Sequence, residues 1–374
     1  MSKLEELIQQ YCPDGVEWKP LKAVLKIKNG RDYKHLGKGP IPVYGSGGIM
    51  TYVNVPMYTK PSVLIPRKGS IDKLYYADTP FWNVDTVFYT EMDTAQVVEK
   101  YVYYVLQKEH LERLNTAGGV PSLTQSVLNE VLIPVPPLPV QEEIVRVLDT
   151  FTELQAELQA ELQAELQKRL QQYNFYRDNL LNFKDINRGG QEIKWMKMSE
   201  IGNNLDKKRK PITAGKRESG QIPYYGASGI VDYVKDYLFD GDYLLVSEDG
   251  ANLLTRTYPI AFSIHGKTWV NNHAHVIEFK ERATRKYVEY YLNSIDLSPW
   301  ISAGAQPKLT QDSLNKLTIP VPPLAEQQRI VFILDRFDTL TNDLTSGLPA
   351  EIEKRRQQYE FYRDKLLTFK RKEA

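Results

Sequence analysis

The feature that most constrains the fold is an internal duplication. The segment AGGVPSLTQSVLNEVLIPVPPLPVQEEIVRVLDTFTEL (117–154) returns as AGAQPKLTQDSLNKLTIPVPPLAEQQRIVFILDRFDTL (303–340), with 21 of 38 positions identical at a constant offset of 186. At the same offset, KRLQQYNFYRDNLLNFK (168–184) matches KRRQQYEFYRDKLLTFK (354–370) at 13 of 17 positions. The chain is therefore one frame written twice.

Four tetrads, TELQ-AELQ-AELQ-AELQ (152–167), lie inside the first copy and contain no Gly or Pro. All four residue types of the AELQ repeat favour helix, and the flanking sequences extend the prediction to one helix of roughly 40 residues. A four-residue step turns about 400°, so the leucines form one ridge that packs into the groove of a second helix. The second copy keeps the apolar ridge, which predicts helix–helix packing through Leu154, Leu158, Leu162, Leu166, Leu340, Leu344, Leu348 and Ile352.

The second helix differs from the first because it contains Gly347 and Pro349. We expect it to kink or restart near Ser346, which would serve as its N-cap. The first helix leads from one domain to the other, and the second pairs with it most simply by running back. The two helices should therefore be antiparallel, with the two domains related by a pseudo-twofold axis.

The segments before each helix are rich in strand signals. IPVYGSGGIMTYVN (41–54) resembles IPYYGASGIVDYVK (222–235), whereas the regions between such landmarks diverge. Both alternate β-branched or aromatic residues with polar ones between Gly, Pro, Asn and Asp, which is typical of short antiparallel strands. We predict an α+β protein with strand-rich recognition domains at 1–139 and 185–324, and spacer helices at 140–184 and 325–371. The repeated IPVPPL (133–138 and 319–324) is either a rigid elbow before each helix or a ligand for a proline-binding module.

Composition restricts the possible partners. The net charge is only +1, so any nucleic-acid surface must be a local basic patch. Cys12 is the only cysteine, which excludes an internal disulfide and suits a reducing cytosol. The sequence shows neither a signal peptide nor a run long enough to span a membrane. We expect a cytoplasmic protein without membrane contact.

The repeated L-T-Q-x-x-L-N…IPVPPL-x-x-Q-x-x-I-V-x-x-L-D-x-F frame, the Q-Q-Y-x-F-Y-R-D-x-L-L-x-F helix end, the YGxxG turn and the tetrads resemble specificity subunits of type I restriction-modification systems. The resemblance covers nearly the whole chain and is weakest inside the two domains. It implies that each domain reads one half of a bipartite target in double-stranded DNA, and that the helices set the spacer. It also implies assembly with two modification subunits, which use S-adenosylmethionine, and with restriction subunits, which use ATP and Mg²⁺ for translocation and cleavage.

No catalytic site is predicted on this chain, and no cofactor. HGKT (265–268) lacks the first glycine of a phosphate-binding loop, and no Asn- or Asp-Pro-Pro-aromatic tetrad of an adenine methyltransferase is present. His273 and His275 are two residues apart on one face of a predicted strand. Structural hydrogen bonding, contact with DNA and metal binding remain possible roles for this pair, and we predict no metal site because suitably spaced cysteine or carboxylate partners are missing.

The candidate DNA-reading residues are polar side chains in the divergent segments, because Arg recognises guanine, Asn recognises adenine and Lys mostly contacts phosphate. In the first domain they are Arg67, Lys68, Ser70 and Lys73. In the second they are Glu248, Asn252, Arg256, Lys267, Asn271 and Asn272, with Lys207, Lys208, Arg209 and Lys210 as a phosphate patch. An alternative is a coiled-coil protein–protein adaptor that never contacts bases; salt-dependent, sequence-selective DNA binding distinguishes the two.

Overall fold

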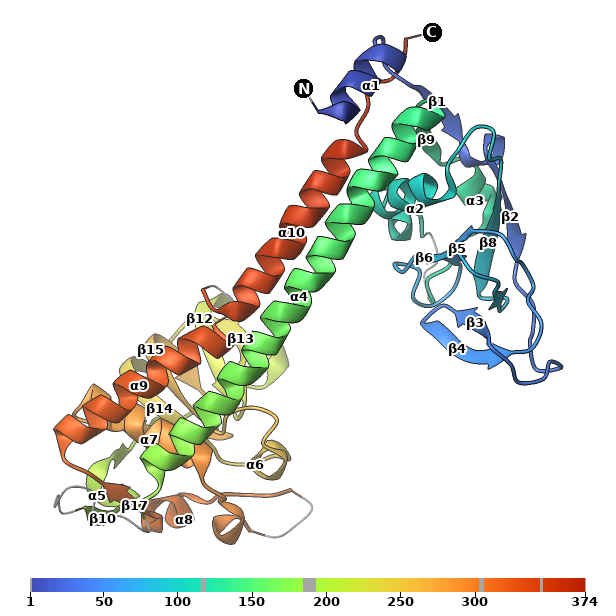
Figure 1. Cartoon of the computed structure of the whole chain (residues 1–374). Coiled ribbons are helices and arrows are strands. Elements are labelled where there is room, and N and C mark those ends of the chain that lie inside the picture. Colours follow the sequence, from blue (N-terminus) through green and yellow to red (C-terminus); the bar gives the residue numbers. More distant parts are fainter. Residues whose placement is uncertain (1, 116–118, 184–192, 303–305, 344–345, 374) are drawn as a thin grey trace. The chain divides into compact units, whose positions relative to one another are not determined.

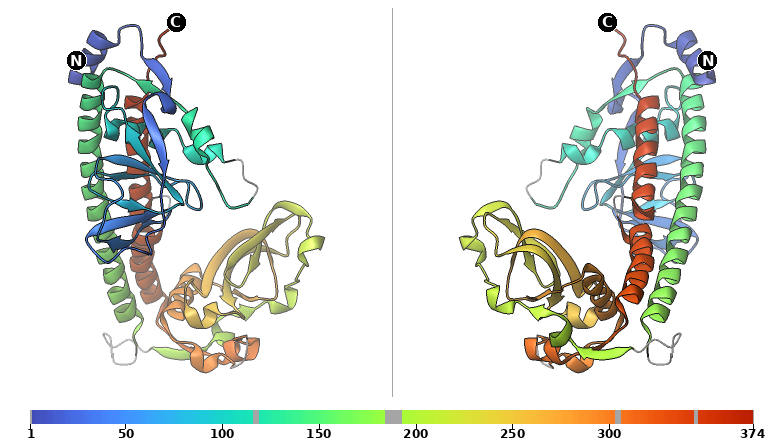
Figure 2. Two further views of the ribbon diagram at one scale, coloured as in Figure 1. Left: turned by 90° about the vertical axis from the view of Figure 1, so that its right-hand side faces the viewer. Right: turned by 90° about the vertical axis from the view of Figure 1, so that its left-hand side faces the viewer.

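A computed structural model describes residues 2–115, 119–183, 193–302, 306–343 and 346–373. The helix predicted from the tetrads is α4 (Leu138–Leu181), a single helix of 44 residues that is continuous in every view (Figures 1 and 2). At about 1.5 Å per residue it is about 66 Å long. The chain divides into a first unit (1–161 and 352–374) and a second unit (162–351), so α4 belongs partly to each.

The first unit is built on three small sheets. A four-stranded sheet has the order β2-β8-β5-β6, a three-stranded sheet the order β4-β3-β7, and β1 pairs with β9 in a two-stranded sheet. The strands are β1 (Glu17–Pro20), β2 (Leu25–Asn29), β3 (Ile41–Gly45), β4 (Gly48–Val53), β5 (Ser62–Pro66), β6 (Tyr75–Ala77), β7 (Trp82–Asn83), β8 (Val87–Met92) and β9 (Leu132–Val135). The helices are α1 (Lys3–Tyr11), α2 (Glu99–Lys108) and α3 (Gln125–Asn129), with the short turns η1 (Leu21–Ala23) and η2 (Leu111–Leu114).

The second unit has one six-stranded sheet of order β11-β16-β14-β15-β12-β13. Its strands are β10 (Lys194–Lys197), β11 (Asn203–Asn204), β12 (Ser219–Gly226), β13 (Gly229–Val234), β14 (Phe239–Ser247), β15 (Ala261–Val270), β16 (Ala274–Glu278) and β17 (Thr318–Val321). Its helices are α5 (Met198–Ile201), α6 (Asn252–Thr255), α7 (Arg282–Ser294), α8 (Gln311–Lys316) and α9 (Leu324–Asn342), with η3 (Asp206–Lys208), η4 (Ala214–Lys216) and η5 (Ser298–Trp300). The α+β class is confirmed.

The four-stranded and three-stranded sheets of the first unit together correspond to the six-stranded sheet of the second. In the second unit, β15 pairs antiparallel with β14 and parallel with β12, and so joins all six strands. The corresponding stretch of the first unit is split into β6, which pairs with β5, and β7, which runs parallel to β3. The interruption falls at 78–81 and includes Pro80, which has no N–H to donate to a ladder. One divergent segment thus changes the sheet while the frame around it is kept.

The frame itself repeats in its hydrogen bonds. A tyrosine hydroxyl donates to a proline carbonyl, a second tyrosine donates to an aspartate of the helix that follows, and a glutamine side chain donates to another proline carbonyl. At the offset of 186 the pairs are Tyr101–Pro134 and Tyr287–Pro320, Tyr104–Asp149 and Tyr290–Asp335, and Gln141–Pro136 and Gln327–Pro322. The prolines of IPVPPL therefore anchor the start of each helix, as a rigid elbow would.

Each core receives the start of one helix and the end of another. In the first unit, Val140, Ile144 and Leu148 of α4 are buried together with Leu367, which follows α10 (Leu348–Leu366). In the second unit, Ile330 and Leu334 of α9 are buried together with Leu180 and Leu181 at the end of α4. Burial of apolar side chains at both ends fixes the helices to the domains.

Two contacts establish how the partners of α4 run. In the first unit the hydroxyls of Thr152 and Tyr359 are 2.9 Å apart. In the second unit Tyr176 stacks on Phe337 of α9, with ring centroids 5.4 Å apart. In the first unit the start of α4 shares a core with Leu367, and in the second unit its end shares a core with Ile330 and Leu334. Within each unit the partner number therefore falls as the number along α4 rises, so α9 and α10 run antiparallel to α4, as predicted.

The second helix is interrupted where the sequence predicts. Helix α9 ends at Asn342 and α10 begins at Leu348, so the spacer segment 325–371 contains two helices. The prediction of Ser346 as the N-cap is corrected, because Gly347 directly precedes the restart. The Ser346 hydroxyl instead donates to the Asp343 carboxylate at 2.5 Å.

The predicted packing ridge is only partly covered. Leu158, Leu162, Leu166, Leu348 and Ile352 are half-buried. Leu154 and Leu340 are 56% and 37% exposed, and Leu344 lies outside the described residues. Packing through this ridge stays a prediction.

Candidate nucleic-acid interface

The first candidate segment follows the buried strand β5. The first loop, defined as Arg67–Ser70, begins directly after Pro66. Its Gly69 adopts a φ of +81°, a conformation that favours glycine. The Arg67 guanidinium lies 4.9 Å from the centre of the Phe88 ring and 3.5 Å from the Asn29 side-chain oxygen. Lys68 is exposed and Ser70 half-buried, and Lys73 is exposed just beyond the loop.

The second candidate segment follows β14. The second loop, defined as Glu248–Ala251, contains Gly250 at a φ of +106°. Glu248 is buried and binds two cations: Arg209 Nη1 at 2.6 Å and Lys308 Nζ at 2.9 Å. Asp249 accepts from His273 Nδ1 at 2.9 Å. Both carboxylates of this loop are therefore engaged by side chains of the chain itself.

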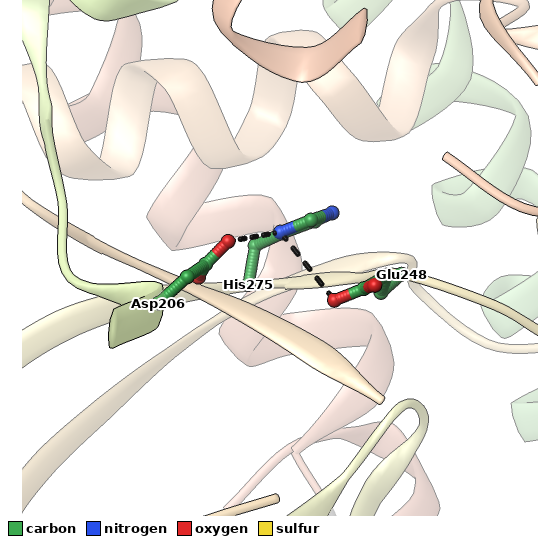
Figure 3. A group of neighbouring side chains, drawn as sticks. All are labelled: Asp206, Glu248 and His275. Carbon is green, nitrogen blue, oxygen red and sulfur yellow. Dashed lines mark hydrogen bonds and ion pairs between the residues drawn. The ribbon is translucent and has the colours of Figure 1, made fainter. Parts of the chain in front are cut away.

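Next to Glu248 lies the buried histidine His275 (Figure 3). Its Nδ1 is 2.6 Å from Asp206 and 3.8 Å from Glu248, and its Nε2 is 2.8 Å from the Leu309 carbonyl. The Leu309 carbonyl oxygen only accepts hydrogen bonds, so Nε2 donates to it, while Nδ1 lies at hydrogen-bond distance from the Asp206 carboxylate. Structural hydrogen bonding, one of the roles left open for His275, is the one the geometry shows.

The carboxylates of this cluster are held in the ionised form. Burial raises the pKa of Asp206, but the hydrogen bond and charge of His275 outweigh it and keep that pKa below its usual range. Burial likewise raises the pKa of Glu248, and the hydrogen bonds from Arg209 and Lys308 outweigh it, so this pKa is also lowered. We call these five residues, Asp206, Arg209, Glu248, His275 and Lys308, the ionic cluster.

Among the residues that the structure describes, Asp206, Glu248 and His275 are the one group with ligand atoms close enough to hold a metal ion, all within 4.8 Å of one another. Both carboxylates are already paired with Arg209 or Lys308, so a divalent metal would have to displace these cations. His273 is turned to Asp249 and does not share a ligand position with His275. The arrangement favours an ion-pair cluster over a metal site.

The remaining candidates of the second domain fall into two groups. Arg256 donates to the carbonyls of Leu292 and Ile295, and burial lowers its pKa. Asn252 and Asn271 also hold backbone groups, those of Tyr258 and His273. The side chains that reach solvent are Lys207, Lys208, Lys210, Lys267 and Asn272.

Sequence reasoning missed Asp206 and Lys308. Asp206 lies far before His275 in the sequence, with a separation of 69 positions, and the sheet strand β16 brings His275 against it. Lys308 had a weak signal, because it replaces Ser122 within the otherwise repeated PSLTQ and PKLTQ. Base and phosphate contacts of the other candidates stay predictions.

Comparison with known proteins finds the same duplication. A family model described as "Type I restriction modification DNA specificity domain" matches residues 13–168 and again 191–354. The chain is 32% identical to the specificity subunit of the type I restriction enzyme EcoR124I/EcoR124II of Escherichia coli, over all of this chain and 98% of that one. It is 41% identical to a protein of Haemophilus influenzae named as a type I restriction enzyme specificity subunit, over 48% of this chain and 47% of that one.

Solved structures share the fold. One, described as showing complex assembly and conformational transition of a type I restriction-modification system, has a TM-score of 0.67 at 13% identity, over 95% of this chain and 98% of that one. The S subunit of a type I system from M. genitalium has a TM-score of 0.50 at 17% identity, over 94% of this chain and 96% of that one.

None of the helices in the described ranges combines the length and the apolar character that a membrane span requires.

Proposed function

We infer how this chain works from the family to which it belongs, the DNA specificity subunits of type I restriction-modification systems. We propose that each unit reads one half of a split target in double-stranded DNA. The observation that carries this proposal is the repeated frame holding unlike segments: equivalent backbone hydrogen bonds recur around the loops after β5 and β14, which share only their glycine. One scaffold with two different loops suits two different half-sites.

Helix α4 and its antiparallel partners would set the distance between the half-sites. A helix transmits a fixed length, because each residue adds about 1.5 Å along a straight axis unless Pro or Gly intervenes. Residues 152–167 contain neither. We propose that these tetrads act as the spacer of the target.

The same duplication supports two equivalent partners. Because the frame occurs twice, any surface it presents to a modification subunit occurs twice, which supports binding of two such subunits.

S-adenosylmethionine would then be bound by those subunits, and ATP with Mg²⁺ by restriction subunits, while this chain carries no cofactor and no catalysis. Since the ionic cluster is balanced by Arg209 and Lys308, it offers no obvious reacting group. DNA as the target implies a cytoplasmic location. The alternative of an adaptor without base recognition has no support from the family.

The test is adenine-methylation mapping by single-molecule sequencing of a host that expresses this chain with its modification subunit. The control host expresses the modification subunit alone. A new mark in a split motif is expected. If both subunits assemble and no mark appears, or if the mark lies in an unsplit motif, the proposal is wrong.

A further inference from the structure

The first and second loops occupy the same place in the two units. In each loop, the backbone of the residue that begins the loop forms hydrogen bonds with residues at two equivalent positions. The glycine N–H of each loop donates to the proline carbonyl of the repeated frame. The pairs are Arg67–Leu123 and Glu248–Leu309 (both 2.8 Å), Arg67–Thr86 and Glu248–His273 (2.8 and 2.9 Å), and Gly69–Pro121 and Gly250–Pro307 (3.3 and 3.1 Å). Isolated bridges join Lys68 to Ser122 and Asp249 to Lys308. Arg67 and Lys68 are therefore the structural counterparts of Glu248 and Asp249.

The charges at these equivalent positions are opposite. The first loop carries two cations, and within the described part of the chain no carboxylate forms an ion pair with either. Arg67 lies over the Phe88 ring, and Lys68 is exposed. The first loop thus offers hydrogen-bond donors directly.

The second loop carries two anions, but neither is offered to solvent. The side chains of Glu248 and Asp249 are only 11% and 13% exposed, whereas their partners Lys308 and His273 are 47% and 46% exposed. The carboxylates face inward, and Lys308 and His273 face outward. Both units therefore present a lysine at the same place, Lys68 from the first loop itself and Lys308 from another segment that the second loop holds.

We propose that these loops are the base-reading position of each unit, with Lys68 reading in the first and Lys308 reading in the second. Glu248 is a positioning residue that orients Lys308. This inference rests on the proposed function.

Cationic donors match acceptor edges of bases. In the major groove, guanine presents N7 and O6 as adjacent acceptors, and adenine presents N7. A carboxylate behind a lysine restricts the ammonium to a few directions, which a base contact needs and a phosphate contact does not. Each half-site is therefore expected to contain a purine, recognised at its acceptor edge, at the position that its loop contacts.

The test uses the complete chain with its modification subunit and maps the methylated motif. Lys68→Ala is expected to relax preference at one base pair of the first half-site by about tenfold, the size of one base contact, and to leave the second half-site unchanged. Lys22→Ala is the matched control, because Lys22 is also an exposed lysine of the first unit, paired with Glu130. It is expected to leave the motif unchanged.

In the second unit, Lys308→Ala is expected to relax one base pair of the second half-site alone. Glu248→Gln should relax the same base pair, because it frees the lysine without removing it, and Lys308→Arg should retain the preference. Lys316→Ala, which removes an exposed lysine paired with Asp312, is the control. A change confined to one base pair of one half-site is a result that loss of folding does not produce.

Two results would overturn the inference. If the lysine variants keep the wild-type motif, the loops do not read bases. If they lower methylation equally at all sites, the lysines contact phosphate or a partner subunit. A wild-type complex that marks no split motif would instead refute the proposed function, so the two failures are distinguishable.

Discussion

At the scale of the residue, the two units stabilise equivalent loops by different means. In the first, the Arg67 guanidinium packs on the Phe88 ring. In the second, His275 lies between two carboxylates, Asp206 and Glu248, in the interior. Removing one member of a buried ionic group leaves the others without their partner, which costs far more than losing an exposed pair.

Asp206→Asn should therefore destabilise the second unit by about 3 kcal/mol at pH 7. The reason is that the substitution removes the buried carboxylate that His275 contacts at 2.6 Å and Arg209 at 3.3 Å. Urea unfolding measures this change. Asp312→Asn, which breaks an exposed pair with Lys316, should have a much smaller effect, on the order of 0.5 kcal/mol or below. Equal losses in the two variants would contradict the role given to the ionic cluster.

The same variant has a defined pH dependence. The pKa of Asp206 is lower in the folded chain than its usual value. Its stabilisation is therefore present above the unfolded pKa, about 4, and is lost as the pH falls through the folded pKa. The stability difference between wild type and Asp206→Asn should hold from pH 7 down to about 4 and shrink as the pH is lowered further, and a difference that stays constant below that point would contradict the account.

These residue roles could not be predicted from the sequence. Glu248 is a hydrogen-bond acceptor in a divergent segment, so residue type alone suggested a base reader, and Arg209 within 207–210 suggested a phosphate contact. The sheet brings the two side chains to 2.6 Å, which leaves each with a partner. Sequence reveals residue types, but pairing across 39 positions depends on strand order.

At the scale of the element, local and periodic signals were sufficient. The tetrads predicted α4, and the strand-rich segments 41–54 and 222–235 form the hairpins β3–β4 and β12–β13. The break between α9 and α10 also followed from Gly347 and Pro349. The interruption of the first unit's sheet at 78–81 could not be predicted. Residue types alone do not show that one copy has a single long strand, β15, where the other has the separate strands β6 and β7.

The break between α9 and α10 depends on Gly347. An added Cβ there would lie 2.6 Å from the Thr339 carbonyl oxygen and 2.8 Å from those of Leu340 and Asp343. Gly347→Ala is therefore expected to destabilise the second unit by about 1–3 kcal/mol, since backbone must move to admit the methyl group. Thermal unfolding measures the loss. Gly215→Ala, where a Cβ meets no atom within 4 Å, is the control, and an equal effect of both would contradict the steric account.

At the scale of the whole molecule, we propose that two equivalent frames read two half-sites at a spacing set by the helices. The frames account for what both halves share, which is attachment of the helices. The divergent loops account for what must differ, which is the sequence of each half-site. Length and sequence of the target are therefore controlled by separate parts of the chain.

The most direct measurement is the methylated motif of a variant with one extra AELQ inserted within 152–167. Four residues add about 6 Å of helix, and at about 3.4 Å per base pair the spacer should lengthen by roughly one to two base pairs while both half-sites keep their sequence. A variant that assembles with its modification subunit but methylates the original motif, with its original spacer, would contradict the claim.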